Sequence, residues 1–146
     1  MLNTNEALLG AWLRISTSIN NNRIVTDLPY NESLICNILY RNELTQPGQL
    51  LTATELCTET KILKSQMNRI LEQMEEKHLI FRERSPKDKR KIYIRLNHDP
   101  KTPYFDQHEK ILTIMDSVIT GLGKEKSEEA VKLLNDISDV ANKLFS

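Results

Sequence analysis

The chain has 146 residues, of which 39% are apolar and 27% are charged, so it is long enough for one globular domain with a substantial hydrophobic core. No apolar run approaches the roughly 18 residues that a membrane span requires, so we expect no transmembrane segment and no membrane partner. Formal net charge is zero, yet residues 60–96 carry eleven Lys/Arg against five Asp/Glu, while the rest of the chain carries nine against fifteen. This asymmetry predicts that a polyanion docks on one side of the protein.

The first half of the chain is predicted to form three helices. Apolar residues recur at helical spacing through residues 5–22, which end in a polar stop. A second helix is predicted to follow Pro29, and its buried side carries Leu34, Ile35, Ile38 and Leu39. Thr52 and Glu55 then have the spacing of a capping box, in which a hydroxyl and a carboxylate three residues later satisfy free amides at a helix start. The sequence therefore predicts a short third helix that ends near residue 60.

A longer fourth helix and two strands are predicted next. The helix spans residues 62–77, and its apolar positions share one face: Leu63, Met67, Ile70, Leu71 and Met74. Strands are predicted at residues 79–84 and 91–96, and in the second of these apolar and polar residues alternate. A short helix, a tight connection, a longer helix and a basic hairpin are the layout of a winged helix-turn-helix. In this module a helix fits the major groove of DNA and the hairpin reaches the minor groove.

Helical-wheel positions assign roles to the side chains of the fourth helix. Ser65 and Arg69 lie opposite the apolar face and are predicted to read bases, whereas Lys64 lies nearer the core and is predicted to reach a phosphate. Glu72 and Glu76 follow one and two turns later, so we expect the helix to enter the groove by its N-terminal end. The predicted DNA-binding residues of the helix are Lys61, Lys64, Ser65, Gln66, Asn68 and Arg69.

The turn between the two strands supplies a second set of DNA-binding candidates. Residues 85–91 include five charged side chains, four of them basic, and a solvated turn is the alternative interpretation of such a charge run. The single acid, Asp88, is predicted to orient Arg90 by a charge-assisted hydrogen bond and not to meet DNA itself. The predicted DNA-binding residues of the hairpin are Arg84, Lys87, Asp88, Lys89 and Arg90.

The last third of the chain is predicted to be helical. Thr102 followed by Pro103 is a helix-start signal, and an apolar stripe runs from there to about residue 122, where glycines break it. A last helix is predicted for residues 126–145. Three terminal helices with apolar stripes exceed what a small winged helix needs, so we expect them to form a two-fold interface. The expected fold is thus mainly α with a small β-hairpin, as one domain: dimerisation helices in residues 1–28 and 101–146, a DNA-binding lobe in residues 30–98 and a wing in residues 82–95.

The stretch of residues 51–96 resembles the MarR (multiple antibiotic resistance regulator) family of bacterial transcription factors. The likeness includes the helix-turn-helix, an E-x-x-x-L-I-x-R sequence that begins at Glu75, and the D-x-R wing motif at residues 88–90. It implies a homodimer on a pseudo-palindromic operator in double-stranded DNA, with Arg90 at the minor groove and Asp88 bracing it. Ile62 and Leu63 stand where many members carry a Ser or Thr helix cap.

The resemblance also implies a small phenolic or lipophilic effector, bound in a crevice between the dimer helices and the DNA-binding lobe. Trp12, Tyr40 and His108 are the candidates to line that crevice, and packing in the core is the alternative for each of them. Some relatives sense oxidants through a cysteine. Neither Cys36 nor Cys57 has an adjacent basic residue that would lower its pKa, so we predict inert thiols, with a redox-sensing regulator as an alternative function.

The sequence shows no motif of an enzyme. It lacks a Gly-rich phosphate loop, a G-x-S-x-G motif and a metal-spaced set of His and Cys, so we expect no catalysis, no cofactor and no metal. The first ten residues lack the features of a signal peptide, and we expect a cytoplasmic protein. The predicted function is a sequence-specific, ligand-responsive repressor. A winged helix used for protein interaction is the other alternative, and the basic wing favours DNA.

Overall fold

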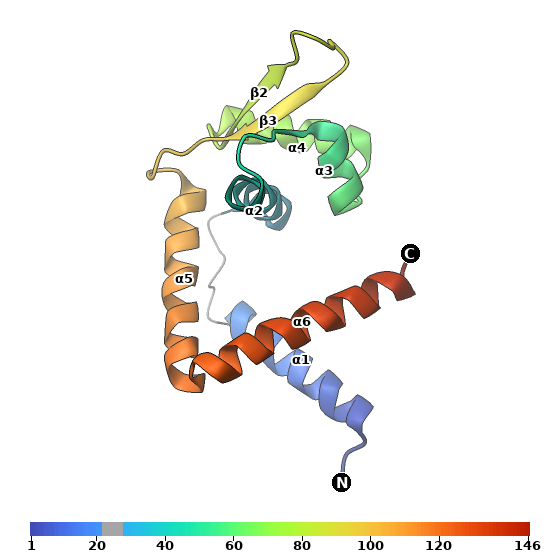
Figure 1. The fold of residues 1–146 in the computed structure, drawn as a ribbon, viewed down its shortest axis with the longest axis vertical. Helices are drawn as coiled ribbons and strands as arrows, with labels where there is room; N and C mark the ends of the chain where they lie inside the picture. Colours follow the sequence, from blue (N-terminus) through green and yellow to red (C-terminus); the bar gives the residue numbers. More distant parts are fainter. Residues whose placement is uncertain (22–27) are drawn as a thin grey trace. The chain divides into compact units, whose positions relative to one another are not determined.

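The computed structural model describes residues 1–21 and 28–146 of the chain (Figure 1). Within them the chain forms six α-helices and a three-stranded antiparallel sheet. The elements are α1 (Thr4–Asn21), α2 (Tyr30–Thr45), β1 (Leu51–Thr52), α3 (Ala53–Thr60), α4 (Lys64–Glu76), β2 (Ile80–Arg84), β3 (Ile92–Leu96), α5 (Pro103–Leu122) and α6 (Lys124–Leu144). The chain divides into two compact units, residues 1–108 and 109–146, and the boundary falls inside α5. None of the described helices is long and apolar enough to cross a membrane.

The predicted order of elements is confirmed, with small changes at the helix ends. The expected end of the first helix at Asn22 lies outside the described residues. Gly121 does not interrupt α5, which ends at Leu122. The break comes at Gly123, whose φ of 91° lies in the left-handed region that favours glycine. The last helix therefore begins at Lys124, two residues before the predicted start.

The predicted hairpin is confirmed and belongs to a larger sheet. β2 and β3 pair antiparallel in a register that runs from Ile80 opposite Leu96 to Arg84 opposite Ile92. A third strand, β1, pairs with the other edge of β3, which gives the order β1-β3-β2. The sequence did not predict β1 as a strand, because two residues are too few to show an alternating pattern. This short pairing holds the start of α3 against the sheet.

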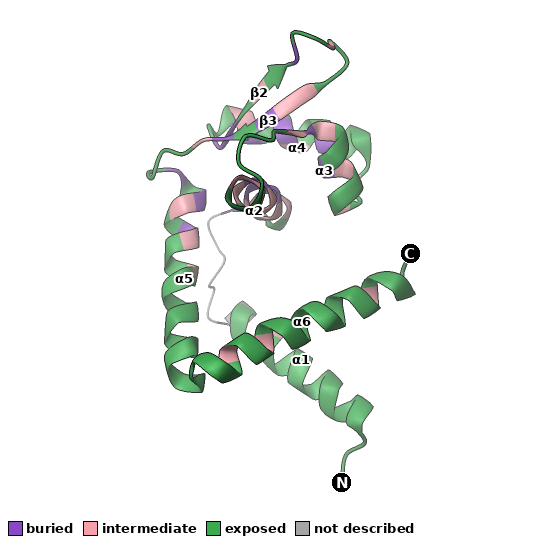
Figure 2. Ribbon diagram, in the orientation of Figure 1, coloured by how far each residue is buried: buried purple, intermediate pink, exposed green. Residues whose placement is uncertain are grey.

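The hydrophobic core lies in a lobe built from α2, α3, α4, the sheet and the first turns of α5. Figure 2 shows the buried residues gathered in these elements, whereas α1, α6 and the later turns of α5 are mostly exposed. The core side chains that are fully buried are Ile35, Cys36, Leu56, Met67, Leu71, Met74, Leu79, Ile80 and Ile94. Apart from Leu79, which lies between α4 and β2, they come from the helices and strands of the lobe.

The predicted N-cap of α3 is confirmed, but the carboxylate of the capping box accepts the Thr52 hydroxyl and not a backbone amide. The amide of Glu55 donates to Thr52 Oγ1 at 3.2 Å, and the Thr52 hydroxyl donates to Glu55 Oε1 at 3.1 Å. At the other end of α3, Lys61 takes a left-handed backbone conformation with φ 62°, and its amide donates to the carbonyl of Cys57 at 2.8 Å. This closes the helix and turns the chain toward α4 within three residues.

The structure corrects the predicted start of the fourth helix. α4 begins at Lys64, not at residue 62, and Leu63 is its N-cap with extended φ and ψ of −64° and 147°. The prediction that Leu63 lies on the buried face is wrong, since its side chain is 72% exposed. A helical wheel places a side chain only if its backbone is helical, and the backbone of Leu63 is not. From Met67 onward the predicted apolar face is buried, with Ile70 half-buried beside it.

α4 ends in a Schellman motif, a pair of backbone hydrogen bonds that satisfies the last carbonyls of a helix. The amide of Leu79 donates to the carbonyl of Met74 at 2.9 Å, and the amide of His78 donates to the carbonyl of Glu75 at 3.0 Å. His78 occupies the left-handed position of the motif with φ 60°, where glycine is the usual residue. The amide side chain of Asn97, after β3, donates to the His78 carbonyl at 2.7 Å. The exit of α4 is thereby tied to the end of the sheet.

An ion pair that the sequence analysis did not foresee joins α2 to α4. The side chain of Glu32 is only 4% exposed, and Lys77 Nζ lies 3.0 and 2.9 Å from its two carboxylate oxygens. A buried carboxylate without a partner is costly, so Lys77 offsets the desolvation of Glu32. The residues are 45 positions apart, and sequence spacing carries no signal for such a pair.

The start of α5 packs on α2 through polar side chains. Gln107 Nε2 donates to Ser33 Oγ at 3.2 Å, and the Tyr104 hydroxyl lies 3.5 Å from Asn37 Oδ1. α5 begins at Pro103, as the helix-start signal predicts. The buried hydroxyl of Thr102, one residue earlier, has no hydrogen-bond partner among the described residues. The first two turns of α5 are thus part of the lobe that carries α4.

Removal of Lys77 tests the buried pair. Lys77→Met should lower the free energy of unfolding by about 2 kcal/mol, because it leaves the buried Glu32 carboxylate without a partner. Arg95→Met is the matched control, since Arg95 and Glu83 form an ion pair at 2.9 Å in which both side chains are more than half exposed, and it should cost less than about 1 kcal/mol. Urea unfolding of both variants at one protein concentration measures the difference. Equal losses would contradict the role given to Glu32.

Candidate nucleic-acid interface

The outward face of α4 is polar and exposed. All six residues predicted to bind DNA from this helix and its approach are exposed: Lys61, Lys64, Ser65, Gln66, Asn68 and Arg69. The opposite face holds Met67, Leu71 and Met74, each at most 1% exposed. Because these three side chains are anchored in the core, the helix can present only its polar face to a ligand. Glu72 and Glu76 are exposed further along, so cations concentrate at the N-terminal end of the helix.

Two grooves border this outward face. Lys64 and Asn68 line a groove between α3 and α4, together with Thr54, Cys57 and neighbouring residues of α3. Gln66 and Arg69 line a second groove, which α4 forms with the start of α2. The predicted site residues of α4 therefore occupy both sides of one exposed ridge. Lys64 lies on the α3 side of that ridge, and its contact with a phosphate stays a prediction.

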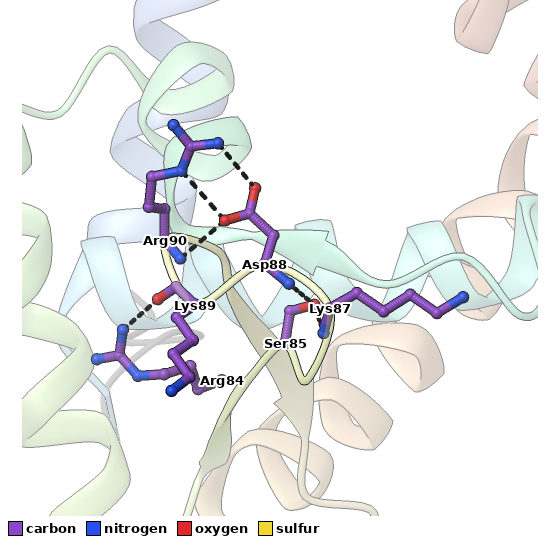
Figure 3. A network of polar contacts seen from close by, with 6 residues as sticks. All are labelled: Arg84, Ser85, Lys87, Asp88, Lys89 and Arg90. Carbon is purple, nitrogen blue, oxygen red and sulfur yellow. Dashed lines mark hydrogen bonds and ion pairs between the residues drawn. The ribbon is translucent and has the colours of Figure 1, made fainter.

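The tip of the hairpin is held by its own side chains (Figure 3). Ser85 is 5% exposed, and its hydroxyl oxygen accepts the amides of Lys87 at 3.3 Å and Asp88 at 3.2 Å. The amide of Ser85 donates to the carbonyl of Lys91 at 2.9 Å, which closes the base of the turn. The Arg84 guanidinium donates to the carbonyl of Lys89. Ser85 is a site residue that was not predicted, although a serine before a proline in a turn can accept amides in this way.

The predicted hydrogen bond between Asp88 and Arg90 is confirmed. Asp88 Oδ1 accepts both the amide of Arg90 at 3.0 Å and its Nε at 3.2 Å. These bonds hold the pKa of the Asp88 carboxyl below its usual range. The Arg90 side chain remains 92% exposed while its Nε is engaged, and Figure 3 shows the guanidinium lying over the carboxylate at the outer edge of the turn. The pair therefore presents an oriented cation to solvent. Lys87 and Lys89 are exposed beside it.

A second ion pair joins the wing to α4. Arg82 on β2 donates to Glu75 near the end of α4 through Nη2 at 3.0 Å, Nε at 3.2 Å and its amide at 3.2 Å. The Arg82 guanidinium holds the pKa of the Glu75 carboxyl below its usual range. The arrangement places the base of the wing in a defined position relative to α4. A ligand that contacts both elements therefore meets them at a set spacing.

The candidates for an effector crevice are placed differently from one another. Tyr40 on α2 and His108 on α5 are half-buried, and their ring centroids are 5.2 Å apart. His108 also stacks on Tyr104 at 5.3 Å, and burial lowers its pKa. Trp12 lies on α1 with its side chain 61% exposed. The structure thus brings Tyr40 and His108 together at the junction of α2 and α5.

The two cysteines occupy different environments. Cys36 is fully buried on α2, and burial raises the pKa of its thiol to about 12. A thiol in that state is a poor nucleophile at neutral pH. Cys57 is half-buried on α3. Within the described residues no three His, Cys, Asp or Glu side chains are grouped so that they would hold a metal ion.

Comparison with known proteins identifies relatives of this arrangement. The model of the MarR family matches residues 26–91. No curated protein sequence matches the chain. Similar solved structures include a mutant MepR from a multidrug-resistant S. aureus clinical isolate, with a TM-score of 0.71 and 16% identity over 97% of this chain and 99% of that one. FabT of Streptococcus pneumoniae, in complex with DNA, has a TM-score of 0.69 and 17% identity over 96% of each chain. BldR of Sulfolobus solfataricus has a TM-score of 0.61 and 17% identity over 94% of this chain and 99% of that one. These likenesses confirm the winged-helix fold.

Loss of the Ser85 hydroxyl tests how the wing tip is held. In Ser85→Ala the amides of Lys87 and Asp88 lose their acceptor, so their hydrogen exchange should accelerate about fivefold for one hydrogen bond of about 1 kcal/mol. The global unfolding midpoint should change little, because the turn lies outside the core. Ser65→Ala, an exposed serine on α4, serves as the control and should leave both amides unchanged. Unaltered exchange in Ser85→Ala would show that the hydroxyl does not hold the turn.

Proposed function

We propose that the chain, whose residues 26–91 match the model of the MarR family, is a DNA-binding transcriptional regulator of that family and binds a pseudo-palindromic operator as a homodimer. The observation that carries the proposal is the exposed polar face of α4 beside a wing whose Arg90 is oriented by Asp88. α4 enters the major groove by its N-terminal end, and Ser65 and Arg69 read base edges there. Lys64 neutralises a phosphate, and Arg90 enters the adjacent minor groove.

The homodimer is supported by the apolar faces of the terminal helices. α1, the second half of α5 and α6 each expose large apolar side chains by more than a third, among them Leu8, Trp12, Val118, Leu133 and Val140. Monomeric soluble proteins rarely expose apolar surface on this scale. A second copy of the chain is the partner that would cover these faces and give two recognition helices related by a two-fold axis.

The regulator is further proposed to be a repressor that leaves its operator when a small molecule binds. The half-buried rings of Tyr40 and His108 support a site at the junction of α2 and α5, because an aromatic or lipophilic ligand could pack on them beside the buried ring of Tyr104. Sensing through Cys36 is disfavoured by its burial and its raised pKa. A protein-interaction role is disfavoured by the basic wing, since a protein partner does not need an exposed guanidinium held at the tip of a hairpin.

Removal of the Arg90 side chain tests the assignment of the wing. Arg90→Ala should weaken binding to a selected operator by more than about 1 kcal/mol, which is about fivefold, because a groove contact is lost. Arg90→Lys keeps the charge but not the planar guanidinium, so its affinity for the operator should lie between those of the natural chain and Arg90→Ala. Lys101→Ala is the control, because it removes an exposed cation outside the interface, and it should leave the affinity for the operator nearly unchanged.

Fluorescence anisotropy over a range of salt concentrations measures these affinities. For the natural chain the logarithm of the binding constant should fall linearly with the logarithm of salt concentration, by about 0.9 per neutralised phosphate. Unchanged affinity in Arg90→Ala would contradict the role of the wing. Equal affinity for random duplexes would contradict sequence specificity, and salt-independent binding would contradict the proposed function as a whole.

A further inference from the structure

An exposed leucine stands at the N-terminal tip of the recognition helix. Leu63 is the N-cap of α4, makes no side-chain capping hydrogen bond and has an extended backbone. This backbone turns its side chain away from the lobe, where it is 72% exposed. Ile62, one residue earlier, packs against the hydrophobic core and keeps that part of the chain fixed. The exposure of Leu63 is therefore a property of a well-anchored turn.

Leu63 is an exception within the helix-turn-helix. In residues 53–76, all of which the structure describes, it is the only exposed large apolar side chain. The exposed residues that follow it, such as Lys64 and Ser65, can donate hydrogen bonds to base edges or phosphates. A leucine can do neither, so its contribution to a DNA interface has to come from apolar contact.

The major groove offers one apolar group, the C5-methyl of thymine, among base edges that otherwise carry hydrogen-bond donors and acceptors. The N-terminal residues of a recognition helix are those that contact base edges. We propose that Leu63 is a specificity-determining residue that packs against a thymine C5-methyl in each half-site. The proposal rests on the proposed function, because it requires α4 to lie in the major groove.

This role makes two demands on the measurements, and the first of them distinguishes it from a purely structural role. Removal of the thymine methyl, with hydrogen bonding unchanged, should weaken binding only when Leu63 is present. The dependence of affinity on salt should stay the same in a Leu63 variant, since leucine neutralises no phosphate. A purely structural role for Leu63 would move neither the response to the methyl group nor the salt slope. A protein partner on Leu63 would also be indifferent to the DNA methyl group.

The test uses the full chain and duplexes that it selects from a random library. Each thymine of the selected half-site is replaced in turn by deoxyuridine, which lacks only the methyl group. When the thymine that Leu63 contacts is replaced in one half-site, the natural chain should bind about fourfold more weakly, as expected for one buried methyl group worth about 0.8 kcal/mol. In Leu63→Ala the affinities for thymine and deoxyuridine at that position should be equal, with an unchanged salt slope.

Leu44→Ala is the matched control, because Leu44 is a leucine of similar exposure (66%) on α2. It should keep the fourfold preference for thymine. The inference is overturned if the selected half-site contains no thymine, if no replacement weakens binding, or if Leu63→Ala retains the preference. Failure of the chain to select any sequence would instead overturn the proposed function, so the two failures are distinguishable. Thermal unfolding of Leu63→Ala checks that the variant is folded.

Discussion

The burial of one face of α4 is the constraint on which the rest of the interface depends. Met67, Leu71 and Met74 are each at most 1% exposed, so the helix cannot rotate without exposing them. Full burial of a side chain of this size contributes about 1.5–3 kcal/mol. The exposed side chains of Lys64, Ser65 and Arg69 form no hydrogen bond with another described side chain, so the buried face sets the direction of the helix that carries them. Their polar atoms are available to base edges and phosphates.

Contacts at the C-terminal end of α4 fix the helix relative to the rest of the lobe. The Schellman motif and the pair of Lys77 with the buried Glu32 hold its C-terminal end, and Arg82 with Glu75 joins it to the wing. The pKa of Glu75 is lowered in the folded state. The stability that its pair with Arg82 contributes is therefore present above the ordinary carboxyl pKa and is lost as the pH falls through the lowered value. Helix and wing thus keep a set spacing at neutral pH, which recognition of adjacent grooves requires.

Features with a local signal could be predicted from the sequence, and those that depend on tertiary contacts could not. The N-cap of α3 at Thr52, the alternation in β3 and the pair of Asp88 with Arg90 each lie within a few residues, and all three are confirmed. Leu63 was misplaced because apolar periodicity continues past the point where the helical backbone begins. The partner of Lys77 is 45 residues away, and the two-residue β1 is defined only by its pairing with β3. The DNA-binding roles of the exposed side chains stay predictions.

We infer that two copies of this chain place two α4 helices in successive major grooves. Hydroxyl-radical footprinting of the full chain on a selected duplex, with the mass of the complex measured by sedimentation, tests it most directly. We expect two protected half-sites on one face of the DNA, about one helical turn or 34 Å apart, bound by a dimer. A single protected half-site bound by one copy, or equal protection along random DNA, would contradict it.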